Sequence, residues 1–151
     1  MRRTPRVLAV ASGGGHWIQL QRLRPAFEGC ELAFVSVFPD YREDVAGHRF
    51  HVAPDATRRD AWKLPLLAAS LFATILRERP DVIVTTGALP GLVAIALGRL
   101  LGKKTMWVDS IANAERFSTS GRHARRFASV WLSQWPEVAA KEGAECWGAV
   151  L

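Results

Sequence analysis

Short runs of consecutive apolar residues alternate along this chain with longer segments in which apolar residues recur every three or four positions. The first run, Val7 to Ala11, is apolar throughout, which is typical of a parallel strand buried on both faces. The next segment, His16 to Phe27, has apolar residues at helical spacing, and Leu32 to Val37 follows as a second strand-like run. The pattern therefore predicts strands and helices in strict alternation.

The same alternation continues to the end of the sequence. Helices are predicted over Ala61–Arg79, where Pro80 ends the segment, and over Leu92–Leu101. Further strands are predicted at 50–53, 81–85, 104–108, 130–134 and 144–147. No linker or repeat divides this pattern, and alternating strands and helices form a parallel sheet covered on both faces. We therefore predict one α/β domain over residues 1–151, a Rossmann-like doubly wound parallel sheet.

Glycine-rich turns follow the first and the fourth predicted strands. In Ser12 to His16, three consecutive glycines permit a tight turn and leave helix amides free to meet an anion. This turn lacks the third glycine of a dinucleotide fingerprint and the lysine of a P-loop. The second turn is Thr85 to Gly91. Ligands of such sheets bind beyond the carboxyl ends of the strands, so we expect the two turns to face each other across one crevice.

Several side chains at these turns have two open interpretations. His16 is placed to take a proton from an acceptor hydroxyl, or only to bind a phosphate or cap its loop. Gln19, one turn further along, orients a substrate or is simply solvated. Asp109, after the fifth predicted strand, meets sugar hydroxyls or caps its own loop. Gly91 approaches a ligand or serves only close packing of helix on strand.

The charge balance favours an anionic partner. Lysine and arginine number 20 against 14 acidic residues, a net charge of +6, although many basic faces serve only solubility. No nucleic-acid recognition motif is present, so we predict no nucleic acid as partner. Cys30 and Cys146 lack metal-ligand spacing, and we predict neither a metal nor a cofactor. The apolar helix Ala61–Arg79 is either a core helix or one that rests on an anionic bilayer or a polyprenyl chain.

Taken in order, these turns resemble a known enzyme family. The sequences Gly13-Gly14-Gly15-His16 and Asp81 to Gly87, the Pro90-Gly91 pair, and a strand that ends at Asp109 are similar to the N-terminal half of MurG-like glycosyltransferases. The resemblance is strongest to versions in which that half is a separate chain. Examples are the membrane-anchoring subunit of the eukaryotic dolichol-linked N-acetylglucosaminyltransferase and PssD-type subunits of bacterial capsule and exopolysaccharide synthesis.

The resemblance implies a GT-B enzyme split into two chains. This chain is then expected to hold a polyprenyl-diphosphate-linked acceptor, while a donor-binding partner with a second Rossmann-like domain binds the UDP-sugar, N-acetylglucosamine or another UDP-linked hexose. Transfer would invert the anomeric centre. The sequence begins without an apolar anchor and ends where a fused enzyme would enter its second domain. We therefore expect a cytoplasmic subunit with peripheral contact to the inner face of the membrane.

Site residues follow from the turns and the resemblance together. We predict His16 and Asp109 as catalytic, although relatives usually have Glu at the position of Asp109, and we expect the large Trp17 to narrow the pocket. Predicted substrate contacts are Gly13, Gly14, Gly15, Gln19, Thr86, Gly87, Pro90, Gly91, Ser110 and Asn113. Two alternatives stay open: a non-catalytic scaffold that recruits a transferase to the membrane, and an unrelated Rossmann-like nucleotide binder.

Overall fold

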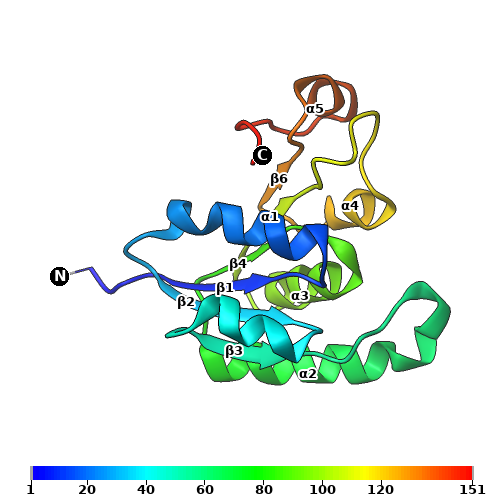
Figure 1. The fold of residues 1–151 in the computed structure, drawn as a ribbon. Helices are drawn as coiled ribbons and strands as arrows, with labels where there is room; N and C mark the ends of the chain where they lie inside the picture. The colour runs from blue at the N-terminus through cyan, green and yellow to red at the C-terminus, as the bar shows by residue number, and fades with distance from the viewer. Residues whose placement is uncertain (1, 151) are drawn as a thin grey trace.

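A computed structural model describes residues 2–150, which fold around one sheet of six parallel strands (Figure 1). The strand order is β3-β2-β1-β4-β5-β6, which is the order of the Rossmann fold. The strands are β1 (Arg6–Val10), β2 (Glu31–Ser36), β3 (Arg49–Val52), β4 (Val82–Thr85), β5 (Lys104–Val108) and β6 (Val130–Leu132). The predicted α/β class and doubly wound parallel sheet are therefore confirmed.

Helices connect the strands and cover both faces of the sheet. The α-helices are α1 (Gly15–Leu23), α2 (Leu64–Glu78), α3 (Ala88–Leu100), α4 (Thr119–Ala124) and α5 (Pro136–Glu142). Three 3-10 segments join them: η1 (Arg24–Phe27), η2 (Pro39–Val45) and η3 (Arg58–Lys63). Helix α1 lies on one face of the sheet, and α2 and α3 lie on the other (Figure 1). This arrangement leaves the strand ends open to solvent.

Two apolar cores form because successive residues of a strand point to opposite faces. In β1, Leu8 and Val10 join the core under α2 and α3, where Leu71 and Ile95 are fully buried. The alternate residues of the same strand pack toward α1, in a second core that contains Trp17. A strand that is buried on both faces is apolar at most of its successive positions, which explains the apolar runs of the sequence.

The order of the strands reverses between β1 and β4. From β1 the chain proceeds outward through β2 and β3, then returns through α2 to β4 on the other side of β1. The turns that leave the carboxyl ends of β1 and β4 therefore lie next to each other. Such a switch point is the usual ligand site of open α/β sheets.

The structure differs from the sequence prediction near the C-terminus. The strand predicted at 144–147 is wrong: Glu145 forms only an isolated bridge with Leu132. Helix α5 was missed, although Pro136 occupies its first turn, where proline is favoured. Helix α3 begins at Ala88, directly after the glycine turn, rather than at Leu92. Within residues 2–150, no helix has both the length and the apolar character needed to span a bilayer.

Candidate functional site

The two glycine-rich turns line one cavity of about 410 Å³ at the carboxyl ends of the strands. Ser12 and Gly13 come from the first turn, and Ala88, Leu89 and Pro90 from the second. The predicted crevice between the two turns is therefore present. The remaining wall residues are Val37, Phe38, Asp55, Ala56, Thr57, Arg58 and Ser120.

The first turn needs its glycines for two different reasons. A side chain at Gly13 would overlap the ring of Phe38, while Gly14 has a φ of +57°, in the left-handed region that glycine favours. The amide of Gly14 donates to the hydroxyl of Tyr41 at 3.0 Å. Gly15 is exposed at the start of α1 and has open space beside it. Of the three glycines, Gly13 alone is among the wall residues of the cavity, while Gly14 and Gly15 are exposed outside it.

Trp17 does not narrow the cavity, contrary to our expectation. Its side chain is buried in the core on the α1 face and stacks on Tyr41, with ring centroids 4.8 Å apart. Its indole N–H donates to Asp44 at 2.8 Å. One residue after His16, a helical side chain points to a different side of α1, so the tryptophan faces the sheet rather than the cavity.

His16 is fixed by the second turn. Its Nδ1 lies 3.0 Å from the carbonyl oxygen of Thr86, and the Thr86 hydroxyl donates back to the carbonyl of His16 at 2.6 Å. Because a carbonyl can only accept, Nδ1 carries the proton of this contact, and Nε2 of the neutral ring keeps its lone pair. No described residue hydrogen-bonds to Nε2. The imidazole is thus oriented as a proton acceptor.

Gly87 leaves the space that this imidazole occupies. A Cβ at Gly87 would lie 2.8 Å from both Nδ1 and Cε1 of His16, and the φ of Gly87 is +132°. The next residue, Ala88, has a φ of +66°, which is unusual for a residue with a side chain and is typical of functional turns. The backbone of the second turn is therefore shaped around the histidine.

Further along the second turn, Pro90 and Gly91 begin the body of α3. Both are buried, and Pro90 lines the cavity. A side chain at Gly91 would overlap Thr85, whose hydroxyl accepts from the amide of Gly87. Gly91 therefore allows α3 to pack closely on β4. The packing interpretation of this glycine accounts for its contacts.

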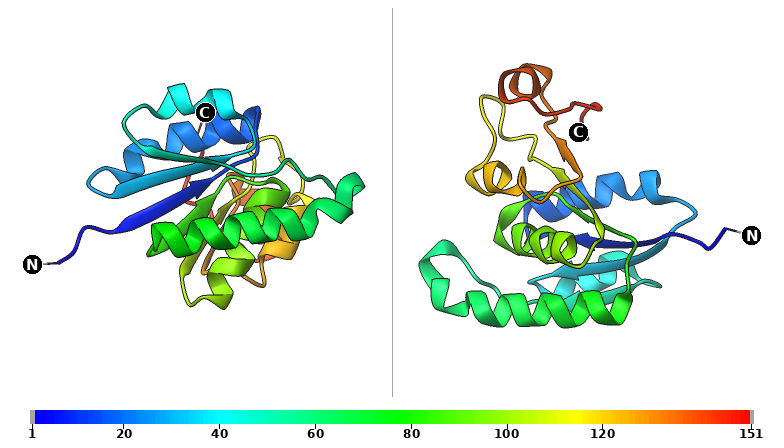
Figure 2. Two further views of the ribbon diagram at one scale, coloured as in Figure 1. Left: turned by 90° about the horizontal axis from the view of Figure 1, so that it is seen from below. Right: turned by 180° about the vertical axis from the view of Figure 1, so that it is seen from behind.

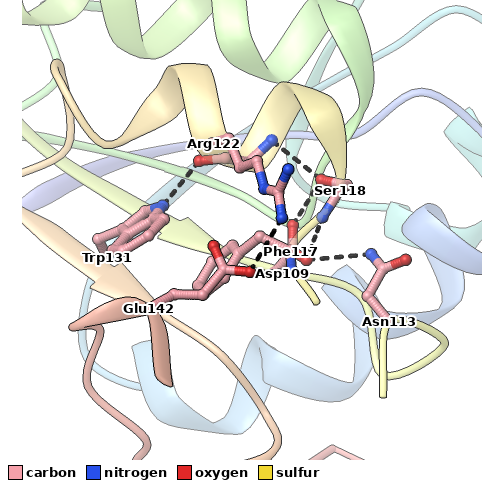
Figure 3. Close-up of polar contacts among 8 residues, drawn as sticks. Asp109, Asn113, Phe117, Ser118, Arg122, Trp131 and Glu142 are labelled. Carbon is pink, nitrogen blue, oxygen red and sulfur yellow. Dashed lines mark hydrogen bonds and ion pairs between the residues drawn. The ribbon is translucent and has the colours of Figure 1, made fainter. Parts of the chain in front are cut away.

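Asp109 is buried directly after β5 and is not among the wall residues of the cavity. Figure 3 shows its contacts with Asn113 and Ser118. Its carboxylate accepts hydrogen bonds from the Trp107 indole at 3.0 Å and from the Asn113 amide at 3.0 Å. It also accepts from the Ser118 amide at 3.0 Å and the Ser118 hydroxyl at 2.7 Å. Both oxygens are thus bonded within the loop that leads to α4. These contacts indicate that Asp109 and Asn113 hold the loop between β5 and α4 in place.

Gln19 and Ser110 belong to a second buried network. The carbonyl oxygen of Gln19 accepts from the amide of Ile111 at 3.1 Å and from the side chain of Gln134 at 2.7 Å. Its amide group donates to the Ser110 hydroxyl at 3.1 Å. Gln134 in turn donates to the backbone carbonyl of Asp109 at 2.9 Å. This network ties α1 to the loop after β5, and the Gln19 side chain is 5% exposed, which contradicts the solvated alternative.

Cavity residues that sequence reasoning missed come mainly from the segment between β3 and α2. Asp55, Thr57 and Arg58 line the cavity together with residues of the glycine turns. No sequence pattern placed Arg58 at the cavity, because it lies in an irregular segment outside the glycine turns. Among residues 2–150, no three His, Cys, Asp or Glu side chains gather as metal ligands would.

Known proteins with similar sequences are subunits of one transferase. The chain is 26% identical to the UDP-N-acetylglucosamine transferase subunit ALG14 of Eremothecium gossypii, over 96% of this chain and 79% of the relative. With the ALG14 subunit of Mus musculus it shares 32% identity over 46% of this chain and 35% of the relative. The chain is homologous to ALG14. No family model matches its sequence.

Solved structures show the same fold in larger proteins. MurG of Acinetobacter baumannii superposes with a TM-score of 0.74 at 15% identity, over 89% of this chain and 43% of that one. A UDP-N-acetylglucosamine 2-epimerase of Rickettsia bellii gives 0.69 at 11% identity, over 95% of this chain and 43% of that one. The chain thus spans less than half of either protein and shares the fold of the part that it covers.

Proposed function

We propose that this ALG14 homologue is the acceptor-binding subunit of a two-chain inverting glycosyltransferase. The sugar would pass from a UDP-sugar, with UDP-N-acetylglucosamine the donor that the relatives' name supports, to a polyprenyl-diphosphate-linked acceptor. The observation that carries this proposal is similarity to a transferase subunit along 96% of the chain. His16 is not itself among the wall residues of the cavity, but it belongs to the turn whose Ser12 and Gly13 line it. Its fixed orientation supports the proposal, because inverting transfer needs a base at the acceptor hydroxyl.

In the proposed reaction, Nε2 of His16 accepts the proton of the acceptor hydroxyl. The hydroxyl oxygen forms a bond to the anomeric carbon of the donor as the bond from that carbon to the UDP oxygen breaks, and UDP leaves with the electron pair. Attack from the face opposite to UDP inverts the anomeric centre. Thr86 holds the tautomer that this step needs, because its carbonyl occupies Nδ1–H.

The donor would be supplied by a partner chain. Both relatives are named as subunits of a transferase, which supports an assembly with a partner chain for this protein too. We propose a partner with a second Rossmann-like domain that places the UDP-sugar over the cavity. Assembly with the partner does not require His16 or Asp109 to act in catalysis. Formation of the complex and transfer of the sugar can therefore be measured separately.

Helix α2 supports a peripheral contact with the inner face of the cytoplasmic membrane. Its inner side is buried, yet the outer side exposes Leu66 and Leu76, which are 57% and 52% exposed, and Trp62 just before the helix is 70% exposed. The helix lies along the outside of the molecule (Figure 2). Exposed arginines flank this outer face at both ends: Arg58, Arg59, Arg77 and Arg79. Apolar residues between basic ends suit an anionic lipid surface.

Vesicle flotation tests this membrane contact. We expect the wild-type chain to float with anionic vesicles and the Leu66→Glu variant to stay in solution. Leu100 is 79% exposed on α3, so Leu100→Glu adds the same charge at another apolar surface residue and should not reduce flotation. Equal loss in both variants would contradict a contact through α2.

Transfer itself is tested with the chain alone and co-expressed with a candidate donor-binding partner. The measurement is transfer of radiolabelled N-acetylglucosamine from UDP-N-acetylglucosamine to a polyprenyl-diphosphate-linked acceptor. We expect activity only in the pair, abolished by His16→Ala while the complex still forms. His123, exposed on α4, supplies the matched control His123→Ala, which should retain activity. An active pair that tolerates His16→Ala would show a scaffold instead.

A further inference from the structure

Arg58 is the one basic side chain among the described residues that line the cavity between the glycine turns. It begins η3 and makes no hydrogen bond or ion pair with any residue from 2 to 150. The nearest acid along the chain, Asp60, already accepts from Thr57 at 3.3 Å and pairs with Lys63 at 3.8 Å. The guanidinium therefore keeps its full set of donors available to a ligand.

The rest of the cavity wall suits an anion that also carries hydroxyls. Ser12, Thr57 and Ser120 bring hydroxyl groups to the wall, and Asp55 is its single acid. An arginine fork binds two oxygens of a phosphate at once, which favours diphosphates over single charges. The carboxylate of Asp55 repels a second anion and can accept hydrogen bonds from sugar hydroxyls. The wall thus offers a cation that suits a diphosphate, and hydroxyl and carboxylate groups that suit a sugar.

Arg58 lies on the cavity wall and directly precedes an apolar surface along the chain. Residues from η3 run directly into α2, so the exposed Trp62 and Leu66 follow Arg58 within about two helical turns. On the other side, the cavity wall continues through Ala88, next to the glycine that packs on His16. An apolar chain, then a diphosphate, then a sugar is the order of groups that this arrangement accommodates.

We propose that Arg58 binds the diphosphate of the lipid-linked acceptor and so selects acceptors that carry a diphosphate. This inference rests on the proposed function. Two other sources offer the same chemistry, the diphosphate of the UDP-sugar and the phosphates of lipid headgroups. An experiment must therefore present each source separately.

Binding of farnesyl diphosphate to the full chain, without vesicles, makes that separation. The probe has an apolar chain and a diphosphate but no nucleoside, and UDP serves as the comparison probe. We expect Arg58→Ala to weaken farnesyl diphosphate binding by roughly 10- to 100-fold, as for loss of hydrogen bonds to a charged group. Arg99→Ala removes the same charge from an exposed residue in the last turn of α3, outside the cavity wall, and should change binding by less than about twofold.

The other results would overturn the inference. They are absence of farnesyl diphosphate binding by the wild-type chain, equal weakening by Arg58→Ala and Arg99→Ala, and a loss of UDP binding in Arg58→Ala without any loss of farnesyl diphosphate binding. A variant that binds the soluble probe normally and loses only vesicle binding would assign Arg58 to lipid headgroups. Absence of transfer by the wild-type pair would count against the proposed function, which this binding measurement does not use.

Discussion

His16 and Thr86 hold each other through two hydrogen bonds that join the first glycine turn to the second. The Nδ1 atom of His16 lies 3.0 Å from the carbonyl oxygen of Thr86, and the Thr86 hydroxyl donates to the carbonyl of His16 at 2.6 Å. Thr86 is fully buried, so solvent does not compete for these bonds. The orientation of the candidate base is therefore set by a residue 70 positions away in sequence.

Thr86→Val should lower transfer by disturbing this orientation. Valine has nearly the shape of threonine but removes the hydroxyl, which costs about 1 kcal/mol of stability. We expect kcat of the pair to fall by roughly tenfold, with little change in KM for the UDP-sugar. Steady-state kinetics and a thermal melt measure both effects, and Thr86→Ser should restore kcat. A valine variant with unchanged kcat would show that the hydroxyl does not orient His16.

Gly87→Ala should remove activity more completely. The new Cβ would lie 2.8 Å from the imidazole of His16, and alanine strongly disfavours a φ of +132°. We expect a stability loss of about 1–3 kcal/mol and loss of transfer as the ring is displaced. Gly102 has a φ of +73° with nothing within 4 Å of an added Cβ, so Gly102→Ala tests backbone strain alone. Retained activity in Gly87→Ala would contradict the importance of this packing.

Asp109→Asn distinguishes a positioning role from direct catalysis. The carboxylate accepts four hydrogen bonds, and an amide would present an N–H group to donors that need an acceptor. We therefore expect the free energy of unfolding to fall by about 1–3 kcal/mol together with a loss of kcat. Thermal melts and kinetics on one preparation decide the matter. Lost activity with an unchanged melting temperature would favour the catalytic role predicted from the sequence.

The fold could be predicted because its strands are buried on both faces. Val7 to Val10 is apolar at every position, and the strands at 81–85 and 104–108 each contain three consecutive apolar residues. Glycine turns directly after two of these strands gave the location of the cavity. The segment 144–147 misled us, since it is short, and one bridge to Leu132 satisfies its backbone without a strand.

The detailed contacts of the site could not be predicted, because they join distant parts of the chain. Gln19 bonds with Gln134, 115 residues away, and no local pattern marks such a pair. Arg58 reaches the cavity from an irregular 3-10 segment, where helical and strand periodicity both fail. For Trp17, the position next to His16 suggested the pocket, yet the apolar core under α1 determines its place.

The carboxylate of Glu78, at the opposite end of the sheet, gives a pH-dependent contribution to stability. It lies at the end of α2, with side-chain exposure of 5%, and accepts from Arg49 at 2.7 Å and His51 at 2.6 Å. Burial alone would raise the pKa of Glu78, but the hydrogen bonds and charges of His51 and Arg49 hold that pKa below its ordinary value of about 4.5. The native state therefore favours the charged form.

Glu78→Gln should lower stability near neutral pH and much less in acid. A group whose pKa is lowered by folding stabilises the native state above its unfolded pKa, and this contribution disappears as the pH falls through the folded value. Because Arg49 is half exposed, we expect a loss of only about 1–2 kcal/mol at pH 6, or roughly 3–6 °C in melting temperature. The difference from the wild type should shrink below about pH 4, while transfer activity at neutral pH stays unchanged. Glu115→Gln, at an exposed loop residue, should show neither effect. A Glu78→Gln deficit that stays constant from pH 7 to pH 3 would mean that packing of the side chain, and not its charge, supplies the stability.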